Sequence, residues 1–499
     1  MRKTKVPFKN IFNLLREKGS SFWSRKAQER SLFLFKEVAE RVPAYRDFLK
    51  KNKIKPIQIK TYNDFQKVPP VTKKNYLRQY PLKDLCWDGS LKDSLVFTAT
   101  SGSTGEPFYF PRNIALEYES SIYHEMFLRN DPNGRNKSTL VVVSFGMGVW
   151  IGGTITFRAF QQIAERGYPV SIITPGINKK EIFEGLKRLG GKFDQVILCG
   201  YPPFIKDIID EAEDFGVHWN KLNLKLILAA EPFSEEFRSY LIKKTGIKNP
   251  FLDTMNIYGS ADIGTMAEET PVSIMIRNIL YKNKDLYEST FPVVSRMPTL
   301  VQFNPLFVNF ESLNGKIICT GDSALPLIRY DIGDQGGIYT YDQMNEVFKQ
   351  NNRDLEKDIR FHKLGHTITK LPFVYVYERS DLSTKLYGAI IFPEHIRESL
   401  QERRLSKYFT GKFTLITKFD SNHNQFLEVN IELKSKAKPT KVLKNLTQSI
   451  ILKNLLKRSA EYKNNYNVIP EKVTPRVIFW PHEDSLYFKP GIKQSWIKK

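Results

Sequence analysis

A short segment dense in hydroxyl groups and glycines is the part of this sequence best suited to chemistry. Residues 100–105 read Thr-Ser-Gly-Ser-Thr-Gly and follow an apolar run at residues 95–97. Glycine lets the backbone approach a ligand closely, and successive N–H groups form a concave site for anions. The hydroxyls add further donors, and phosphate oxygens are the natural guests. We therefore predict a phosphate-binding loop that consists of Thr100, Ser101, Gly102, Ser103, Thr104 and Gly105.

The same segment also has a purely structural interpretation. A Walker loop, GxxxxGK[ST], requires a lysine that this segment lacks. A Ser- and Gly-rich turn between two strands would have the same composition. The loop alone leaves both interpretations open, so the elements around it must decide between them.

Short apolar runs alternate with amphipathic helical patterns between residues 114 and 257. The runs are residues 140–143, 170–173, 195–198 and 224–228, and the helical patterns include residues 180–189 and 204–215. Such alternation predicts an α/β domain with a largely parallel sheet. Ligands of these sheets bind beyond the carboxyl ends of the strands. The turns after each run are therefore the candidate site.

These turns are rich in glycine, aromatic and acidic residues. They read SFGMGVWIGG at 144–153, CGYPP at 199–203, AAEP at 229–232 and NIYGSADIG at 256–264, and PLIRYDIGD follows at 326–334. In their order and intervals these segments resemble motifs of the adenylate-forming (ANL) superfamily. The likeness is closest to phenylacetate–CoA ligases and to the CapK-like proteins of capsular polysaccharide biosynthesis. PLIRYxxGD is the most specific single match.

The resemblance covers most of residues 30–400 and the last dozen residues, and it implies a fold. We expect an α/β protein whose residues 1–380 form a large, multi-subdomain adenylate-forming N-terminal domain with parallel-rich sheets. Residues 381–499 are expected to form a small, mobile α+β C-terminal domain. Residues 271–312 show few helix caps and are interpreted as an insertion.

The resemblance also implies a reaction that uses ATP and magnesium. A carboxylate is joined to the α-phosphate of ATP, pyrophosphate leaves, and the acyl group passes to CoA, to a carrier protein, or to another thiol or amine. Two anions must meet in such a site, so it needs cations and donors aimed at the phosphates. In the family's pattern the loop 100–105 holds the β- and γ-phosphates, and Lys493 neutralises the attacking carboxylate and the α-phosphate. Asp262 or Glu268 holds magnesium, which takes oxygen ligands.

Further roles follow from the same resemblance, residue by residue. Asp334 accepts the ribose hydroxyls, since an ionised carboxylate offers two oxygens to a diol. Arg379 lies near the ribose and phosphate, and Asp381 is the hinge of the small domain. The residues expected around adenine are Ala230, Glu231, Pro232, Tyr258, Gly259 and Ser260, and those expected around the acid are Phe145, Trp150, Tyr201 and Pro203. Taken singly, Asp334 could be a turn residue, Tyr258 and Trp150 core aromatics, and Lys493 part of a solvated basic tail.

Three positions depart from the family's pattern and keep other functions open. Glu106 stands where many of these ligases have lysine, although CapK-like sequences also carry Glu-Pro here. Ala261 and Asp262 replace the Thr-Glu of the Tyr-Gly-x-Thr-Glu motif, and Ser260 could supply the lost hydroxyl. The alternatives are a catalytically silent nucleotide-binding scaffold and an acyl-protein synthetase that transfers the acyl group to a protein cysteine. The likeness to CapK-like proteins suggests a role in surface polysaccharide biosynthesis.

Composition bears on the class of protein and its compartment. With 499 residues, 41% of them hydrophobic and 13% aromatic, the chain can bury a large core and is not disordered as a whole. A net charge of +23 suits anionic partners, but the lysines are spread along the chain and no nucleic-acid motif occurs. We therefore predict no specific nucleic-acid binding. Cys86, Cys199 and Cys319 form neither metal-ligand spacing nor a disulfide framework, which indicates a reducing, cytoplasmic compartment.

Two segments bear on membranes. Residues 139–157 lack charge over the length of a membrane span, but their four glycines favour a buried strand and a turn. In the basic N-terminus, Phe8, Ile11, Phe12 and Leu15 fall at helical spacing. This helix either docks on its own domain or supports weak association with an anionic membrane surface.

Overall fold

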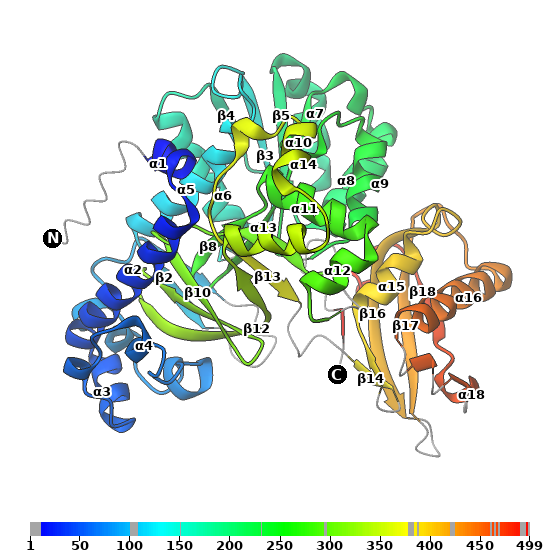
Figure 1. Ribbon diagram of the computed structural model, residues 1–499. Helices are drawn as coiled ribbons and strands as arrows, with labels where there is room; N and C mark the ends of the chain where they lie inside the picture. The colour runs from blue at the N-terminus through cyan, green and yellow to red at the C-terminus, as the bar shows by residue number, and fades with distance from the viewer. Residues whose placement is uncertain are drawn as a thin grey trace.

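The central sheet has eleven strands in the part of the chain that the structure describes (Figure 1). This structure, a computed structural model, describes residues 11–99, 108–149, 151–230, 232–293, 297–377, 384–386, 389–419, 425–459, 462–463, 466–467, 470–489 and 496–497. Across the sheet, the strands are β10 (Val308–Leu313), β11 (Lys316–Gly321), β12 (Leu327–Tyr339), β13 (Phe373–Tyr377), β9 (Thr299–Gln302), β8 (Gly264–Glu268), β7 (Thr254–Ser260), β6 (Leu224–Ala229), β5 (Gln195–Gly200), β3 (Thr139–Ser144) and β4 (Val170–Ile173).

One half of this sheet is parallel and lies between two helical layers. Strands β4, β3, β5, β6 and β7 pair in parallel, as the alternation of apolar runs and helical patterns predicts. Because successive side chains of a strand point to opposite faces, Leu140 and Val142 of β3 pack into one hydrophobic cluster and Val141 and Val143 into another. Helices α7 (Lys179–Leu189), α8 (Pro202–Glu211) and α9 (Glu235–Thr245) cover the first face, and α5 (Ile114–Arg129) and α6 (Ile151–Glu165) the second. A strand buried on both faces is apolar throughout, which explains the continuous runs in the sequence.

The other half of the sheet is antiparallel, from β7 through β8, β9, β13, β12 and β11 to β10. The N-terminal helices α2 (Ser20–Arg41), α3 (Pro43–Lys51) and α4 (Tyr62–Phe65) pack against one face of it. Helices α11 (Pro271–Lys282), α12 (Lys284–Thr290), α13 (Tyr341–Gln350) and α14 (Leu355–Phe361) share a separate cluster with β9 and β13. The hairpin of β1 (Val96–Ala99) and β2 (Tyr109–Arg112) lies outside this sheet.

The interpretation of residues 271–312 as an insertion with few helix caps is wrong. Thr270 caps α11 through a reciprocal hydrogen-bond pair with Ser273, and Pro271 occupies the first helical position. Asn283 caps α12 by accepting a hydrogen bond from the N–H of Leu286. Strand β9 then crosses the middle of the central sheet, so this segment is part of the core.

A small α+β domain follows, as predicted, and it is drawn in yellow to red in Figure 1. Its elements are β14 (Thr384–Leu386), β15 (Ala389–Ile391), α15 (Pro393–Leu400), β16 (Phe409–Phe419), β17 (Gln425–Leu433), α16 (Lys441–Arg458), α18 (Pro470–Val473) and β18 (Arg476–Trp480). Strands β16 and β17 are antiparallel, and β18 runs parallel to β17. The cluster beneath α15 and α16 draws its buried residues from positions 386–496. The predicted boundary between residues 380 and 381 lies outside the described residues and stays a prediction.

The N-terminal helix α1 (Ile11–Glu17) docks on the large domain. Ile11 and Leu15 are buried in a cluster with Trp23, and the guanidinium of Arg129 lies 3.8 Å from the ring centroid of Phe12. Phe8 lies outside the described residues. Ile11, Leu15 and Phe12 therefore already have partners within the chain. Among the described residues, no helix combines the length and hydropathy that crossing a membrane requires.

Candidate functional site

Two reciprocal tyrosine–aspartate pairs mark the candidate site. The hydroxyl of Tyr258, on β7, donates to Oδ2 of Asp334, on β12, over 2.5 Å. The hydroxyl of Tyr330, also on β12, donates to Oδ2 of Asp262, just after β7, over 2.5 Å. Each segment thus supplies one tyrosine and one aspartate, which fixes both carboxylates relative to each other. Asp334 is 9% exposed and Asp262 is 6% exposed.

A lysine from the N-terminal region joins the Asp262 side of this site. Val71 forms two backbone hydrogen bonds with β12, donating to the carbonyl of Arg329 and accepting from the N–H of Asp331. The helical turn Lys73–Leu77 begins directly afterwards, and Thr72 caps it. The ammonium of Lys73 lies 3.3 Å from Oδ2 of Asp262. No role was predicted for Lys73 or Tyr330 from the sequence, although both lie within the residues that the family resemblance covers.

Magnesium would find one suitable carboxylate here, that of Asp262. Magnesium usually takes one or two protein carboxylates together with phosphate oxygens and water, so this donor set fits a phosphate-bound ion. Among the described residues, no group of three or more His, Cys, Asp or Glu side chains could hold a metal.

The structure places Glu268, the alternative magnesium ligand, at the far end of β8 from Asp262. Asp262 precedes β8 and Glu268 ends it, so the strand separates them by roughly 13 Å at about 3.3 Å per residue. Glu268 instead lines a small cavity under α1 together with Asn304. Burial raises the pKa of Glu268 well above its usual range, and the charge of Arg16 only partly opposes this. Asp262 is not among the residues that line this cavity.

The predicted adenine residues gather at the carboxyl ends of β6 and β7. Ala229 pairs with Ile257, so Ala230 lies level with Tyr258 on the neighbouring strand. Ala230 has a φ of 72°, a left-handed conformation that costs a non-glycine residue roughly 1 kcal/mol or more. The ring of Tyr258 stacks on Phe310, with centroids 6.1 Å apart. Ser260 accepts a hydrogen bond from the N–H of Ile263, and Gly259 is exposed.

Two of the residues predicted to surround the acid also meet. Phe145 follows β3 and Tyr201 follows β5, and their rings pack edge to face with centroids 5.1 Å apart. Phe145 is only 1% exposed, so its ring is part of the core wall. A Cβ at Gly152 would lie 3.2 Å from that ring, so this position favours glycine. Pro203 belongs to the first turn of α8.

Several predicted residues lie outside the described residues: Thr100, Ser101, Gly102, Ser103, Thr104, Gly105, Trp150, Glu231, Arg379, Asp381 and Lys493. The strands on either side of the phosphate-binding loop are described. The hydroxyl of Thr98, on β1, donates to the carbonyl of Ala261 over 3.4 Å, and the N–H of Ala99 donates to the carbonyl of Val149 over 3.0 Å. The loop therefore starts beside the Asp262 turn.

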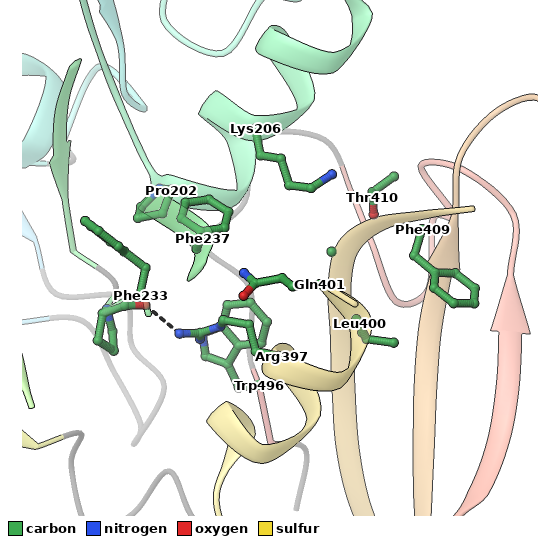
Figure 2. A pocket seen from close by; sticks show the side chains of 12 residues that line it. Pro202, Lys206, Phe233, Phe237, Arg397, Leu400, Gln401, Phe409, Thr410 and Trp496 are labelled. Carbon is green, nitrogen blue, oxygen red and sulfur yellow. Dashed lines mark hydrogen bonds between the residues drawn. The ribbon is translucent and has the colours of Figure 1, made fainter. Parts of the chain in front are cut away.

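The small domain contacts the same region through a pocket between the two domains (Figure 2). Pro202, Pro232 and Phe233 line it from the large domain, and Arg397 and Trp496 line it from the small domain. The carbonyl of Trp496 accepts a hydrogen bond from the N–H of Leu415 over 2.8 Å, which ties the C-terminal segment to β16. Trp496 lies three positions after Lys493 in the sequence.

Ion pairs join one face of α8 and of the helical turn that follows it, Ala212–Phe215, to the small domain. Asp207, Asp210, Glu211 and Asp214 recur at the spacing of a single helical face. Their partners in the small domain are Lys412 (2.9 Å from Asp207), Lys434 (3.4 Å from Asp210), His482 (3.6 Å from Glu211) and Lys436 (3.1 Å from Asp214). This interface could not be predicted from the sequence, because its charges lie far apart along the chain.

No protein-family model matches the chain. In sequence, it is similar to a phenylacetate-coenzyme A ligase of Thermus thermophilus, with 25% identity over 241 residues. The match spans 47% of this chain and 49% of the ligase, about half the length of that relative.

Solved structures resemble the chain over nearly its whole length. A 2-hydroxyisobutyryl-CoA ligase in the postadenylation state, in complex with R3-HIB-AMP, has a TM-score of 0.67 and 13% identity, covering 97% of this chain and 90% of its own. The same ligase in the thioesterification state, in complex with 2-HIB-AMP and CoA, has a TM-score of 0.54 and 14% identity at the same coverage. The acyl acid amido synthetase AtGH3.15 in complex with 2,4-DB has a TM-score of 0.58 and 12% identity, covering 95% of this chain and 88% of its own. At these identities the likeness establishes the fold, which is the one that the sequence resemblance implies.

Proposed function

We propose that this protein activates a carboxylic acid with ATP and transfers the acyl group to CoA or to another thiol or amine. The observation that carries the proposal is that the Ala230 turn, Tyr258 and Asp262, at the carboxyl ends of β6 and β7, meet Asp334 in the middle of β12. Support comes from the shared fold with a CoA ligase that binds an acyl-AMP. The sequence relative is itself a CoA ligase.

In this proposal, Asp334 accepts the ribose hydroxyls while the Tyr258 hydroxyl holds its carboxylate in place. The turn formed by Ala230, Glu231 and Pro232 flanks adenine together with Tyr258, Gly259 and Ser260. Arg379 lies near the ribose and phosphate. The donors of residues 100–105 hold the β- and γ-phosphates, because backbone N–H groups and hydroxyls suit phosphate oxygens.

The first step joins the acid to the nucleotide. A carboxylate oxygen attacks the α-phosphorus, a new C–O–P linkage forms, and the bond to pyrophosphate breaks. Lys493 neutralises the negative charge that the two reactants bring together. Asp262 would hold magnesium, which supplies positive charge beside the phosphates.

The second step moves the acyl group to its acceptor. The acceptor's sulfur or nitrogen attacks the acyl carbon, the bond from that carbon to the phosphate oxygen breaks, and AMP leaves. Residues 381–499 turn about Asp381 between the two steps, relative to residues 1–380. Phe145, Trp150, Tyr201 and Pro203 surround the acid, and their aromatic character favours an aryl or medium-sized acid.

The experiment that tests this proposal is ATP–pyrophosphate exchange with a panel of aryl, acyl and amino acids. Wild type, Asp334→Ala and Lys493→Ala are compared. Exchange with at least one acid, lost in both variants, supports adenylation and the roles of both residues. Exchange that survives in Lys493→Ala assigns the neutralising role to another cation. Bound ATP without exchange for any acid supports the silent scaffold instead.

Acyl transfer to a cysteine of this chain is not favoured. Cys86, Cys199 and Cys319 are buried. Burial raises the pKa of Cys86 to about 12, and it raises the pKa of the other two thiols as well. The charge of Asp334 adds to this effect at Cys319. A thiol that stays protonated and covered is a poor nucleophile.

The cellular setting forms a separate part of the proposal. The likeness to CapK-like proteins motivates a role in surface polysaccharide biosynthesis, in the cytoplasm, with weak attachment to the membrane surface through the basic N-terminus. Deleting the gene should then change the glycan composition of the cell surface. An unchanged glycan would remove this part of the proposal and leave the chemistry untouched.

A further inference from the structure

The turn that carries Pro232 is held from two sides by two arginines that belong to different domains. From the large domain, Arg277 of α11 donates to the carbonyl of Phe233. From the small domain, Arg397 of α15 donates through Nη1 to the carbonyl of Pro232 over 2.5 Å, as the dashed line in Figure 2 marks. Adjacent carbonyls of one turn therefore accept hydrogen bonds from two different domains.

The large-domain side is a rigid anchor. Arg277 and Arg238 form a buried quartet with Glu235 and Glu269, and each of the four residues is at most 3% exposed. Arg277 Nη1 lies 2.9 Å from Glu235, and Arg238 Nη2 lies 2.7 Å from Glu269. Two positive and two negative charges satisfy one another, so breaking any pair would strand a buried charge. All four residues belong to the large domain, so the position of the Phe233 end of the turn does not depend on the small domain.

The small-domain side connects to the C-terminal segment. The guanidinium of Arg397 lies 4.4 Å from the ring centroid of Trp496, and its side chain is 8% exposed. The ring of Trp496 packs on Phe413 at 4.6 Å between centroids. A planar guanidinium can donate to a carbonyl at its edge while an aromatic ring covers its face, which an ammonium cannot do. One side chain thus bridges the turn and the segment that carries Lys493.

We propose that Arg397 is a positioning residue that couples the Pro232 turn to the C-terminal segment in the domain arrangement seen here. The inference rests on the proposed function, because it assigns this arrangement to the adenylation half of the reaction. The higher TM-score to the postadenylation state than to the thioesterification state of one CoA ligase, 0.67 against 0.54, agrees with that assignment. A second interdomain contact, from Ser234 Oγ to Gln401 Oε1 at 3.1 Å, holds the same surfaces together.

The coupling predicts a particular kinetic signature. Loss of the Arg397 contact leaves the buried quartet intact, so the large domain keeps its hold on the turn and on ATP. The C-terminal segment loses its fixed distance to the turn, and a misplaced group of this kind costs on the order of 100-fold in rate. The kcat of ATP–pyrophosphate exchange should therefore fall by roughly 10- to 100-fold, while KM for ATP changes less than about threefold.

The test compares Arg397→Met, Arg397→Lys and Trp496→Leu with the control Arg404→Met. Arg404 is 61% exposed and pairs with Glu402 in the same region of the small domain. Hydrogen exchange of the segments 230–238 and 487–497 is measured beside the kinetics. In both Arg397 variants, the backbone amide hydrogens of both segments should exchange about tenfold faster than in the wild type. Lysine at position 397 should therefore not restore the protection that arginine gives. Trp496→Leu should affect mainly the C-terminal segment, and Arg404→Met neither.

The two readouts separate the failure of this inference from failure of the proposed function. The positioning role would be overturned if the wild type catalyses ATP–pyrophosphate exchange and Arg397→Met has the same kcat. Full ATP–pyrophosphate exchange activity in Arg397→Lys would overturn it too. If wild type exchanges pyrophosphate with no acid, the proposed function fails and hydrogen exchange alone decides the coupling. Equal protection of both segments in wild type and Arg397→Met would then overturn the coupling as well.

Discussion

Replacing Lys412 with methionine should destabilise the contact between the two domains more than an ordinary surface substitution. The Lys412 ammonium, on β16, lies 2.9 Å from Oδ2 of Asp207 and 3.3 Å from Oε2 of Glu432. The side chains of these two acids are 1% and 0% exposed. Lys412→Met keeps the aliphatic stem but removes the cation that the two carboxylates share, and another cation beside them, Lys179, lies 4.0 Å from Asp207.

The magnitude follows from this geometry. Two oxygens that share one ammonium lie at most about 6 Å apart, where two like charges repel by about 3 kcal/mol at an effective dielectric constant of about 20. Removing one partner of a buried pair typically costs about 3–5 kcal/mol. We therefore expect the free energy of unfolding to fall by about 3–5 kcal/mol at pH 8, since both estimates agree.

The loss of stability in Lys412→Met should depend on pH, and its direction follows from the pKa of Glu432. In the wild type, burial and the charge of Asp207 raise the pKa of Glu432, against the opposing charge of Lys412. Without Lys412 that pKa rises further, so the folded variant binds a proton that the unfolded chain does not. Such a group adds stability as the pH falls through its folded pKa. The deficit of Lys412→Met should therefore shrink between pH 8 and pH 5.

Urea denaturation at pH 8 and pH 5 measures the deficit, and hydrogen exchange of β16 and β17 locates it. The matched control is the double variant Lys412→Met with Glu432→Gln, which removes the charge repulsion and should recover a large part of the loss. A loss below about 1 kcal/mol at pH 8, or a deficit that grows in acid, would refute the reasoning about a buried, uncompensated pair.

Further predictions concern other contacts of the site and the interface. Tyr258→Phe should weaken ATP binding about 5- to 30-fold, because it removes one hydrogen bond to Asp334 of about 1–2 kcal/mol. Calorimetry measures this, and an unchanged affinity would contradict the role of that pair. The hydrogen bond to Glu211 raises the pKa of His482 above its usual value, and the charges of Glu432 and Glu483 raise it too. Burial and the charge of Lys179 act in the opposite direction but do not cancel this increase. This contact is complete below the unfolded pKa of histidine and is lost as pH rises through the raised folded pKa, so interdomain distances from spin labels should lengthen with pH, and His482→Ala should remove that change. The buried cysteines should react with a thiol reagent only in denaturant, and rapid labelling of the native protein would show that their cover opens.

The parallel half of the fold could be predicted from the sequence, whereas the antiparallel half could not. Strand β3 is buried on both faces, so its residues are uniformly apolar and stand out as a run. Strand β9 is equally buried but contains Thr299 and Gln302. The amide of Gln302 donates to the carbonyls of Thr369 and Leu371. These partners are distant in the sequence, so the residues around Gln302 do not indicate them. A buried polar residue satisfied at long range looks like a loop residue in sequence.

The candidate site divides in the same way. The Ala230 turn, Tyr258, Asp262 and Asp334 could be found because they lie in segments with recognisable motifs. The bond between Arg397 and Pro232 joins residues 165 positions apart, and no motif marks Arg397. Asp262 and Glu268 lie at opposite ends of β8, a separation that their positions in the sequence do not show. Residues that a second domain contributes are therefore the part that only the structure reveals.

The acidic face of α8 has a consequence for the order in which the protein folds during synthesis. Its carboxylates are made about 200 residues before Lys412, a delay of roughly 10–40 s at about 5–20 residues per second. During that interval Lys179 and Lys206 of the large domain already lie against Glu211 and Asp210. Asp207 and Asp214 still lack the lysines that will meet them from the small domain. We expect the nascent large domain to present an acidic stripe to any cationic surface in reach, and arrival of the small domain to close it.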